Sequence, residues 1–411
     1  MTPLPVHEND NDEHSSALRM CQAARQLWLT ATTKADLQRV EQLYSRAVKR
    51  RQAVVHQQSS SNSSSSGSSI SRKKRKTTQP ELEPEEYRLA LERLALLYVQ
   101  SQRADKAAPG LEELGYTCRL ASSCLDYPLQ QPTNISRTKV IPPCILCDNF
   151  LSKAQQDHLQ AILQDRQSAY WVDHAYAVEP PSPYFSYVMP LEDAAKYGFL
   201  GTLIQQIYTS PNLNIKFARL KDAAFVELWL HNRPHASGHQ MHFDSDNEGR
   251  GGVRNPIVST ILYVTADTGG PSLVTNQTLA NTNLATKGWL CHPAKQRLVA
   301  FDGKVLHGVV PGKGVKTGRR VTLMLAFWKN IRIRKGDGPG AARPFPQQGK
   351  DIPEWLRLFQ AKIPETDKRE KEAAIVESLP IELDRVYETL AGEKWTRPMG
   401  MPEYDEVFQG F

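Results

Sequence analysis

Residues 239–249 read HQMHFDSDNEG and place two histidines and three acidic side chains within eleven positions. On an extended chain, side chains two residues apart point to the same face of the strand. His242 and Asp244 therefore present an imidazole and a carboxylate side by side. Phe243 between them points the other way, into the wall of a sheet. Such a pair is part of a metal site, and a further ligand is expected downstream.

The downstream ligand is predicted at His307. A non-haem Fe(II) site uses two histidines and one carboxylate on one face of the metal and leaves the other positions open. The segment VAFDGKVLHGVVPG provides a histidine at a strand end, 65 residues after His242. We predict His242, Asp244 and His307 as the metal ligands. Asp246 is the alternative carboxylate because it shares the face of Asp244, and His239 is expected in a loop or behind the ligands.

A later strand, predicted at GRRVTLMLAFW, carries a cation and a hydroxyl on one face. Arg320 and Thr322 are two residues apart and therefore share that face. The planar fork of arginine binds a carboxylate through two hydrogen bonds. The pair can thus hold the far carboxylate of a dicarboxylate that chelates the metal through its other end. Arg319 points to the opposite face and is the second choice.

The segment around these residues has the pattern of an antiparallel β protein. From residue 214 onward, short runs such as AAFVELWL, VSTILYVT and QRLVAFDG are rich in β-branched and aromatic residues. Turn sequences such as DTGG and PGKG separate several of them. Many short strands at this spacing are typical of a sandwich or a barrel.

These residues resemble the Fe(II)/2-oxoglutarate-dependent dioxygenases, and in particular their prolyl 4-hydroxylase-like branch. The resemblance rests on His242-Phe243-Asp244, then DTGGPSLV, then FDGKVLHGVVP, and then Gly318-Arg319-Arg320 with Thr322. It covers residues 140–330, which is under half of the chain. It implies an α+β protein whose core is a double-stranded β-helix, or jelly roll, with flanking helices and an N-terminal helical module.

The resemblance also implies a reaction and its cofactors. Fe(II) would be held by the three predicted ligands, and 2-oxoglutarate by the metal together with Arg320 and Thr322. Dioxygen would convert 2-oxoglutarate to succinate and CO2 while a C–H bond is hydroxylated, and L-ascorbate commonly keeps the iron reduced in this branch. Many members place a tyrosine before the His-x-Asp motif to contact 2-oxoglutarate. This chain has ELWLHNRP there instead, and Trp229 is the predicted replacement.

The sequence departs from the branch in one spacing. Arg320 comes thirteen residues after His307, whereas members usually place the cation about ten residues after the second histidine, so Arg319 and Arg320 both remain candidates. The expected substrate is a protein or peptide, with a peptidyl proline first, and a small molecule is an alternative. The β segment lacks a combination of aromatic and basic residues that would indicate nucleic-acid binding. A second alternative is a non-catalytic helical interaction protein on a dioxygenase-like scaffold, which a missing ligand would have favoured.

Composition divides the remaining chain. The predicted units are residues 1–58, an N-terminal helical segment; 59–80, a disordered serine-rich and basic insert; 81–130, a helical hairpin; 135–330, the dioxygenase domain; and 331–411, a Pro/Gly-rich extension with short helices. The hairpin has roughly the packing spacing of a tetratricopeptide unit, with a plain helical bundle as the alternative. The part before residue 130 has no ligand pattern. We expect it to serve location and partner contacts, or to brace the catalytic domain.

The charge and the N-terminal sequence limit the cellular compartments in which we expect the protein. The N-terminus is polar and acidic, and no apolar run is long enough to span a bilayer, so we expect a nuclear or cytoplasmic protein that is neither secreted nor membrane-bound. The net charge of +7 permits an acidic partner without requiring one. The run RKKRK, Arg72–Lys76, is either a solvated patch or a signal for an import receptor. Imaging a variant with this run changed to alanine would distinguish the two.

The six cysteines form no disulfide framework. Cys144 and Cys147 make a C-x-x-C within IPPCILCDNF, but no second pair follows at the spacing of a zinc site. Their apolar neighbours predict two buried thiols on a strand.

Overall fold

The computed structural model describes residues 15–30, 34–62, 84–129, 141–176, 185–246, 253–280, 284–314, 316, 318–335, 341–347, 349, 352–363, 373–397 and 401–410. Most of the predicted insert lies outside these ranges, including the basic run Arg72–Lys76, so nuclear import stays a prediction. None of the helices within them combines the length and the apolar content that a bilayer crossing requires.

The larger sheet has eight strands. Their order is β12 (Arg343–Pro344), β3 (Tyr187–Pro190), β4 (Phe225–Pro234), β11 (Arg319–Trp328), β6 (Val258–Tyr263), β9 (Leu298–Asp302), β2 (Cys144–Asp148) and β13 (Ala374–Val376). All neighbours are antiparallel except β12 and β3. The longest strands, β4 and β11, pair along all ten of their residues. Their β-branched and aromatic content suits a surface buried on both sides.

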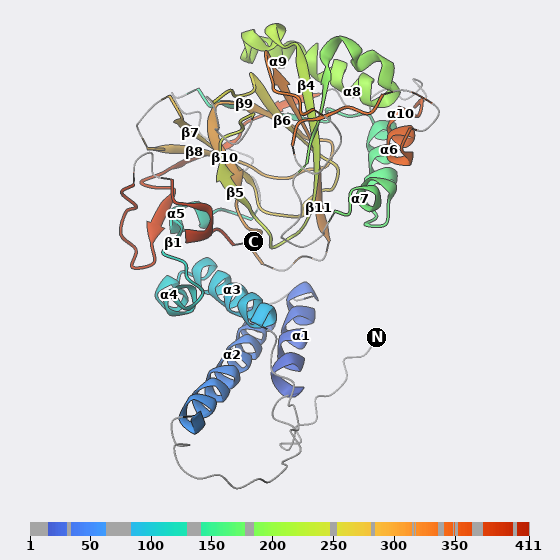
Figure 1. Cartoon of the computed structure of the whole chain (residues 1–411). Helices are drawn as coiled ribbons and strands as arrows, with labels where there is room; N and C mark the ends of the chain where they lie inside the picture. The colour runs from blue at the N-terminus through green and yellow to red at the C-terminus, as the bar shows by residue number, and fades with distance from the viewer. Residues whose placement is uncertain are drawn as a thin grey trace.

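Helices cover the outer face of this sheet. They are α6 (Lys153–Leu163), α7 (Ala169–Asp173), α8 (Gly198–Tyr208), α9 (Pro211–Lys216) and α10 (Glu354–Gln360), with the 3₁₀ segments η1 (Leu191–Tyr197) and η2 (Ala218–Asp222) (Figure 1). Leu228 of β4 and Leu323 of β11 are fully buried in the cluster beneath them. Full burial of one such side chain stabilises the fold by about 1.5–3 kcal/mol.

The second sheet has five strands, all antiparallel. Their order is β14 (Leu379–Glu382), β8 (Lys287–Cys291), β7 (Ser272–Thr278), β10 (Val305–Val309) and β5 (His239–His242). Its inner face packs against the eight-stranded sheet. Ile261 and Phe301 of the larger sheet share one buried cluster with Val274 and Trp289 of the smaller one. The two sheets therefore enclose a common interior.

The N-terminal part forms four helices, and the last two of them pack on the outer face of the five-stranded sheet. They are α1 (Ser15–Thr30), α2 (Lys34–Asn62), α3 (Pro84–Gln100) and α4 (Ala104–Glu113), and they lie below the sheets in Figure 1. Leu96 of α3 and Leu111 of α4 share a buried cluster with Leu290 and Leu306 of the sheet. Helices α1 and α2 pack on α3, so bracing of the sheet and partner contacts both stay predictions for this part.

A three-stranded sheet joins the N-terminal part to the C-terminal extension. Its order is β15 (Tyr387–Thr389), β1 (Cys118–Leu120) and β16 (Val407–Phe408), and α5 (Ser122–Leu125) follows β1 while η4 (Tyr404–Glu406) precedes β16. Across the pair of β1 and β15, Arg119 Nη2 lies 2.6 Å from Glu388 Oε1, and both side chains are buried. Arg385 Nε contacts the other oxygen of Glu388 at 3.3 Å.

The structure corrects the predicted segments in three places. Helix α2 continues to Asn62, past the predicted boundary at residue 58, because neither glycine nor proline interrupts it. The predicted helical hairpin at 81–130 also contains strand β1. The C-terminal extension has the short helix α10, as predicted, but it also supplies strands β12 to β16. These strands are two to four residues long and are defined by the sheet edges they join.

The C-x-x-C thiols are buried on a strand, as predicted. Cys144 packs in the interior between the two sheets, whereas Cys147 packs under the helices on the outer face. Residues three apart on a strand point to opposite faces. The two thiols therefore cannot converge on one zinc ion.

The buried ion pair yields a test of how firmly the C-terminal extension is held. Glu388→Gln leaves Arg119 buried without a carboxylate partner, which typically costs about 3–5 kcal/mol. We expect urea unfolding to show a loss of that order. Glu382→Gln is the matched control, because Glu382 pairs with Lys287 at an exposed strand edge and such pairs contribute about 0–1 kcal/mol. Equal losses in both variants would contradict this role of the pair.

Candidate metal centre

The two predicted histidine ligands lie opposite one another in the five-stranded sheet. His307 of β10 is the Cα partner of His242, the last residue of β5, and their ring centroids are 4.4 Å apart. Asp244 follows two residues after the end of β5. One ligand atom from each of these three residues lies within 4.8 Å of the others, in the only such group among the described residues. The sequence prediction thus names the three side chains that the fold brings together.

Each imidazole is oriented by the carbonyl two residues before it. His242 Nδ1 lies 2.8 Å from the carbonyl oxygen of Gln240, and His307 Nδ1 lies 3.0 Å from that of Val305. A carbonyl only accepts, so both Nδ1 atoms carry the proton. Both Nε2 atoms then face Asp244 Oδ1, at 3.3 Å from His242 and 3.6 Å from His307.

This arrangement favours a positive charge at its centre. Burial lowers the pKa of His307 to about 4, so its Nε2 presents a lone pair at neutral pH. Burial also opposes charge on His242, yet the hydrogen bond and charge of Asp244 raise its pKa above the ordinary value. The lone pair of His307 and the Asp244 carboxylate repel one another unless a positive charge lies between them, which a proton on His242 or a bound cation supplies. The donor set therefore fits a divalent metal with nitrogen and oxygen ligands.

Asp244 is fixed by the larger sheet. Ser259 of β6 donates a hydrogen bond to Asp244 Oδ2 at 2.5 Å, and the side-chain amide of Asn255 donates to the Asp244 carbonyl at 2.6 Å. Burial alone would raise the pKa of Asp244, but His307, His242 and Ser259 together hold it well below its usual range. The carboxylate is therefore charged and correctly turned before any metal binds.

The alternative ligands are engaged elsewhere. Asp246 Oδ2 accepts hydrogen bonds from Arg254 Nε at 2.8 Å and from the backbone amide of Arg332 at 3.0 Å. His239 stands beside the centre, with its ring 5.0 Å from that of His242 and 5.1 Å from that of His231. His239 thus lies on strand β5 beside His242, not in a loop, and is not one of the three converging ligands.

The structure separates the two candidate arginines. Arg319 points away from the interior and donates to Asn232, from Nε to the side-chain oxygen at 2.5 Å and from Nη2 to the carbonyl at 2.8 Å. Arg320 and Thr322 lie on the inner face and are buried. Arg320 Nη1 is buried without a hydrogen-bond partner among the described residues. The guanidinium that is available to an anion is therefore that of Arg320.

A glycine allows Arg320 to lie where it does. Gly269 has a φ of +89°, and a Cβ at that position would come within 2.9 Å of Arg320 Cδ. The Gly269 amide donates to His235 Nδ1 at 2.8 Å, so His235 carries its proton on Nε2 and donates it to the carbonyl of Lys313 at 3.0 Å. The turn at Gly269, which lies against Arg320, is therefore linked by hydrogen bonds through His235 to the segment that contains Lys313.

Trp229 occupies a different position from the anchor residues. On β4 it is the partner of Met324, and it shares a buried cluster with Trp328. The β4 residues opposite Thr322 and Arg320 are instead His231 and Arg233. Trp229 as a contact of 2-oxoglutarate stays a prediction, and the sequence analysis passed over the two β4 residues that face the anchor. The alternation in LWLHNRP could have identified them, once the register of β4 and β11 was known.

Glu227 is a further interior residue that the sequence did not reveal. It is the β4 partner of Ala326, which in turn pairs with Ser259, the residue that holds Asp244. Burial raises the pKa of Glu227 to about 7, although a hydrogen bond from Ser186 at 2.5 Å acts in the opposite direction. A carboxyl group that is half protonated near neutral pH thus faces the interior at the level of the metal ligands.

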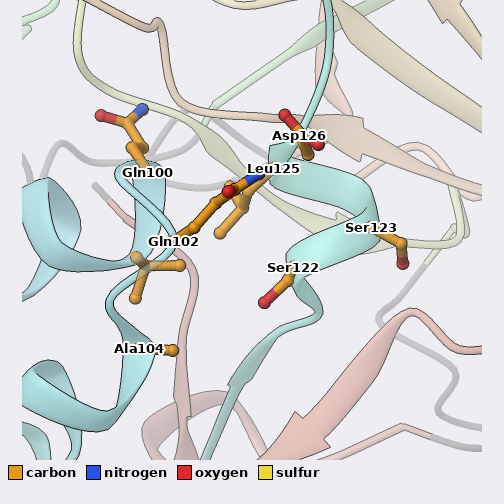
Figure 2. A pocket seen from close by; sticks show the side chains of 8 residues that line it. Gln100, Gln102, Ala104, Ser122, Ser123, Leu125 and Asp126 are labelled. Atoms are coloured by element: carbon orange, nitrogen blue, oxygen red, sulfur yellow. The ribbon is translucent and has the colours of Figure 1, made fainter.

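Figure 2 shows a pocket at a distance from this centre in the fold. It lies where the turn between α3 and α4 meets α5 and is lined by Val99, Gln100, Gln102, Ala104, Ser122, Ser123, Leu125 and Asp126. It contains none of the predicted ligands or anchor residues.

Neither protein-family models nor curated proteins match this sequence. Among solved structures, the chain is similar to a prolyl-4-hydroxylase from Pseudomonas putida at 14% identity and a TM-score of 0.28, over 48% of this chain and 96% of that one. HygX from Streptomyces hygroscopicus with iron bound is similar at 10% identity and a TM-score of 0.27, over 48% and 91%. An oxidoreductase of the 2OG-Fe(II) oxygenase family from Burkholderia pseudomallei is similar at 13% and 0.22, over 35% and 59%.

The similar structures thus include a member of the 2OG-Fe(II) oxygenase family, which the sequence resembles. Likenesses at these identities and TM-scores carry no argument about the reaction. Any inference about the reaction therefore rests on the residues of this chain.

The geometry predicts which histidines hold a metal. His242→Ala and His307→Ala each remove one of three ligands, so we expect either change to abolish stoichiometric binding of Co(II), measured by its visible absorption and by elemental analysis. His239→Ala is the control, because its ring adjoins that of His242 but is not one of the three. If His239→Ala lost the metal while His242→Ala retained it, the ligand assignment would be wrong. Circular dichroism should show each variant folded.

Proposed function

We propose that this protein is a non-haem Fe(II) and 2-oxoglutarate-dependent dioxygenase that hydroxylates a C–H bond and releases succinate and CO2. The observation that carries the proposal is the convergence of His242, Asp244 and His307 in an interior that also holds the unpartnered guanidinium of Arg320. A metal site alone would leave that cation unexplained. A metal together with an anionic cosubstrate accounts for both.

The interior supports the jelly-roll assignment. Along the chain, β4, β6, β9 and β11 belong to the larger sheet, whereas β5, β7, β8 and β10 belong to the smaller one. The chain therefore passes repeatedly between two facing antiparallel sheets, which is the arrangement of a double-stranded β-helix. This topology is what brings His242 of β5 and Ser259 of β6 to the same Asp244.

The protein supplies position and an enclosed site. When bound, Fe(II) activates dioxygen at the expense of 2-oxoglutarate, and that chemistry belongs to the metal. His242, Asp244 and His307 would hold it. Arg320 would bind the far carboxylate of 2-oxoglutarate, and the hydroxyl of Thr322 beside it would donate a further hydrogen bond. Burial of both side chains keeps water from competing for that carboxylate.

We propose a protein or peptide as the substrate, with a proline side chain as the first candidate. Along β11 the inner-face residues run from Arg320 through Ala326, level with Ser259, to Trp328. Arg320 and the tryptophan therefore lie at opposite ends of this wall. Trp229, which is level with Met324 at the middle of the wall, and Trp328 at its end belong to one buried apolar cluster, and apolar surroundings suit an apolar ring such as that of proline. A small-molecule substrate with an apolar group is the alternative.

Anaerobic spectroscopy tests the proposed function directly. Wild-type protein with Fe(II) and 2-oxoglutarate should give the visible charge-transfer band of the chelate, and aerobic incubation should yield succinate. His307→Ala should give neither. Wild-type protein without the band would contradict the dioxygenase and favour the non-catalytic scaffold.

The two arginines should differ sharply in their effect on the cosubstrate. Arg320→Ala removes a buried contact to a carboxylate, a loss of about 2–5 kcal/mol, so the 2-oxoglutarate concentration needed for half-maximal signal should rise more than tenfold. Arg319→Ala should leave that concentration nearly unchanged, because its guanidinium binds Asn232 on the other face. A larger effect of Arg319→Ala would reverse the assignment.

A further inference from the structure

We propose that Arg233 is a second binding residue for 2-oxoglutarate and shares its far carboxylate with Arg320. This inference rests on the proposed function, because it assigns a further residue to the same cosubstrate. Arg233 belongs to the β4 segment LHNRP, which the sequence analysis considered only for Trp229 before it.

Arg233 and Arg320 face the same interior. They are Cα partners in the antiparallel pair of β4 and β11. Directly opposed residues in such a pair lie on the same face of the sheet, with Cβ atoms about 4.5–5.5 Å apart. The next inner pair is His231 and Thr322. Arg233 therefore lies beside the predicted anchor, on the strand that precedes β5, which carries His242.

Neither guanidinium is neutralised by the protein. Arg233 is 8% exposed and Arg320 is 3% exposed. Nε and Nη1 of Arg233, and Nη1 of Arg320, are buried without a hydrogen-bond partner. Within the described ranges no carboxylate forms an ion pair with either side chain, and the nearest recorded partner of Arg233 is the ring of Tyr176, 5.8 Å away.

The other two buried arginines among the described residues each pair with a carboxylate. Arg119 pairs with Glu388 at 2.6 Å, and Arg297 pairs with Asp148 through Nε at 2.5 Å and Nη2 at 2.8 Å. Like charges directly opposite one another destabilise a sheet, and a buried charge without a partner is costly. Burial lowers the pKa of Arg320 to about 10, and Arg233 acts in the same direction. Two opposed and unpaired cations are therefore the pattern of a site for an anion.

A carboxylate has the acceptor capacity to join them. Its two oxygens offer about four lone-pair sites, so it can accept from Arg320 and Arg233 together. A cosubstrate with a far carboxylate gains both contacts, whereas an analogue without that group leaves two cations buried and unpaired. The arginine pair should therefore select a dicarboxylate more strongly than one arginine would.

Calorimetry on Ni(II)-loaded full-length protein tests this selection. The two ligands are 2-oxoglutarate and 2-oxopentanoate, which has the same chain length but no far carboxylate. We expect Arg233→Gln to weaken 2-oxoglutarate binding by about tenfold or more, as loss of a buried charge contact does. The affinity for 2-oxopentanoate should not fall, because that ligand has no partner for Arg233. Arg233→Lys should restore part of the affinity for 2-oxoglutarate.

The control is Arg319→Gln, which removes the adjacent outward-facing cation and should not change the preference between the two ligands. Equal weakening of both ligands by Arg233→Gln, or weakening of neither, would overturn the proposal.

A second titration separates this inference from the proposed function. If wild-type protein with metal does not bind 2-oxoglutarate, the dioxygenase assignment fails, and glutarate is then titrated into the metal-free protein. Glutarate binding that is lost in both Arg233→Gln and Arg320→Gln supports a two-arginine carboxylate site. Glutarate binding that does not depend on Arg233, or no glutarate binding at all, overturns it.

Discussion

The antiparallel pairing of β5 with β10 is the constraint on which the candidate site depends. It sets His242 opposite His307, and on each strand the carbonyl two residues back fixes the imidazole with Nε2 pointing inward. Asp244 completes the group only because β6, in the other sheet, supplies Ser259. A slip of one residue in either strand would turn its histidine to the outer face. The register of the two sheets therefore determines the chemistry.

Local spacing was enough to find two of the three metal ligands and to rank the two arginines. His242 and Asp244 share a face because they are two residues apart, and Arg320 and Arg319 differ in face because they are adjacent. Both inferences need only the period of a strand. His307 required more, namely a strand-end histidine in a context that resembles a known family. The structure brings these residues together in the way that their spacing implied.

The rest of the site could not be predicted from short sequence segments, because it depends on pairing between strands that are distant in the sequence. Arg233 and Arg320 meet only through the register of β4 and β11, which no local pattern gives. Trp229 was predicted from its place before the His-x-Asp motif, and only the register shows that it lies opposite Met324. The same limit explains the short strands of the C-terminal extension. Their two to four residues carry no clear period, and they are strands because the edges of existing sheets accept them.

The unpaired charges imply a cost to the empty protein. Two buried guanidiniums lie without carboxylate partners, and the lone pair of His307 faces the charged Asp244 carboxylate, so the interior opposes the stability that the surrounding apolar clusters provide. Ligands that bind only the folded chain return that stability in proportion to their affinity. The helices α3 and α4 and the buried pair of Arg119 and Glu388 secure the outer face of the smaller sheet. The packing on the outer face thus offsets the cost of the unpaired charges in the interior. The features that destabilise the empty site are those that make it selective for a cation and a dicarboxylate together.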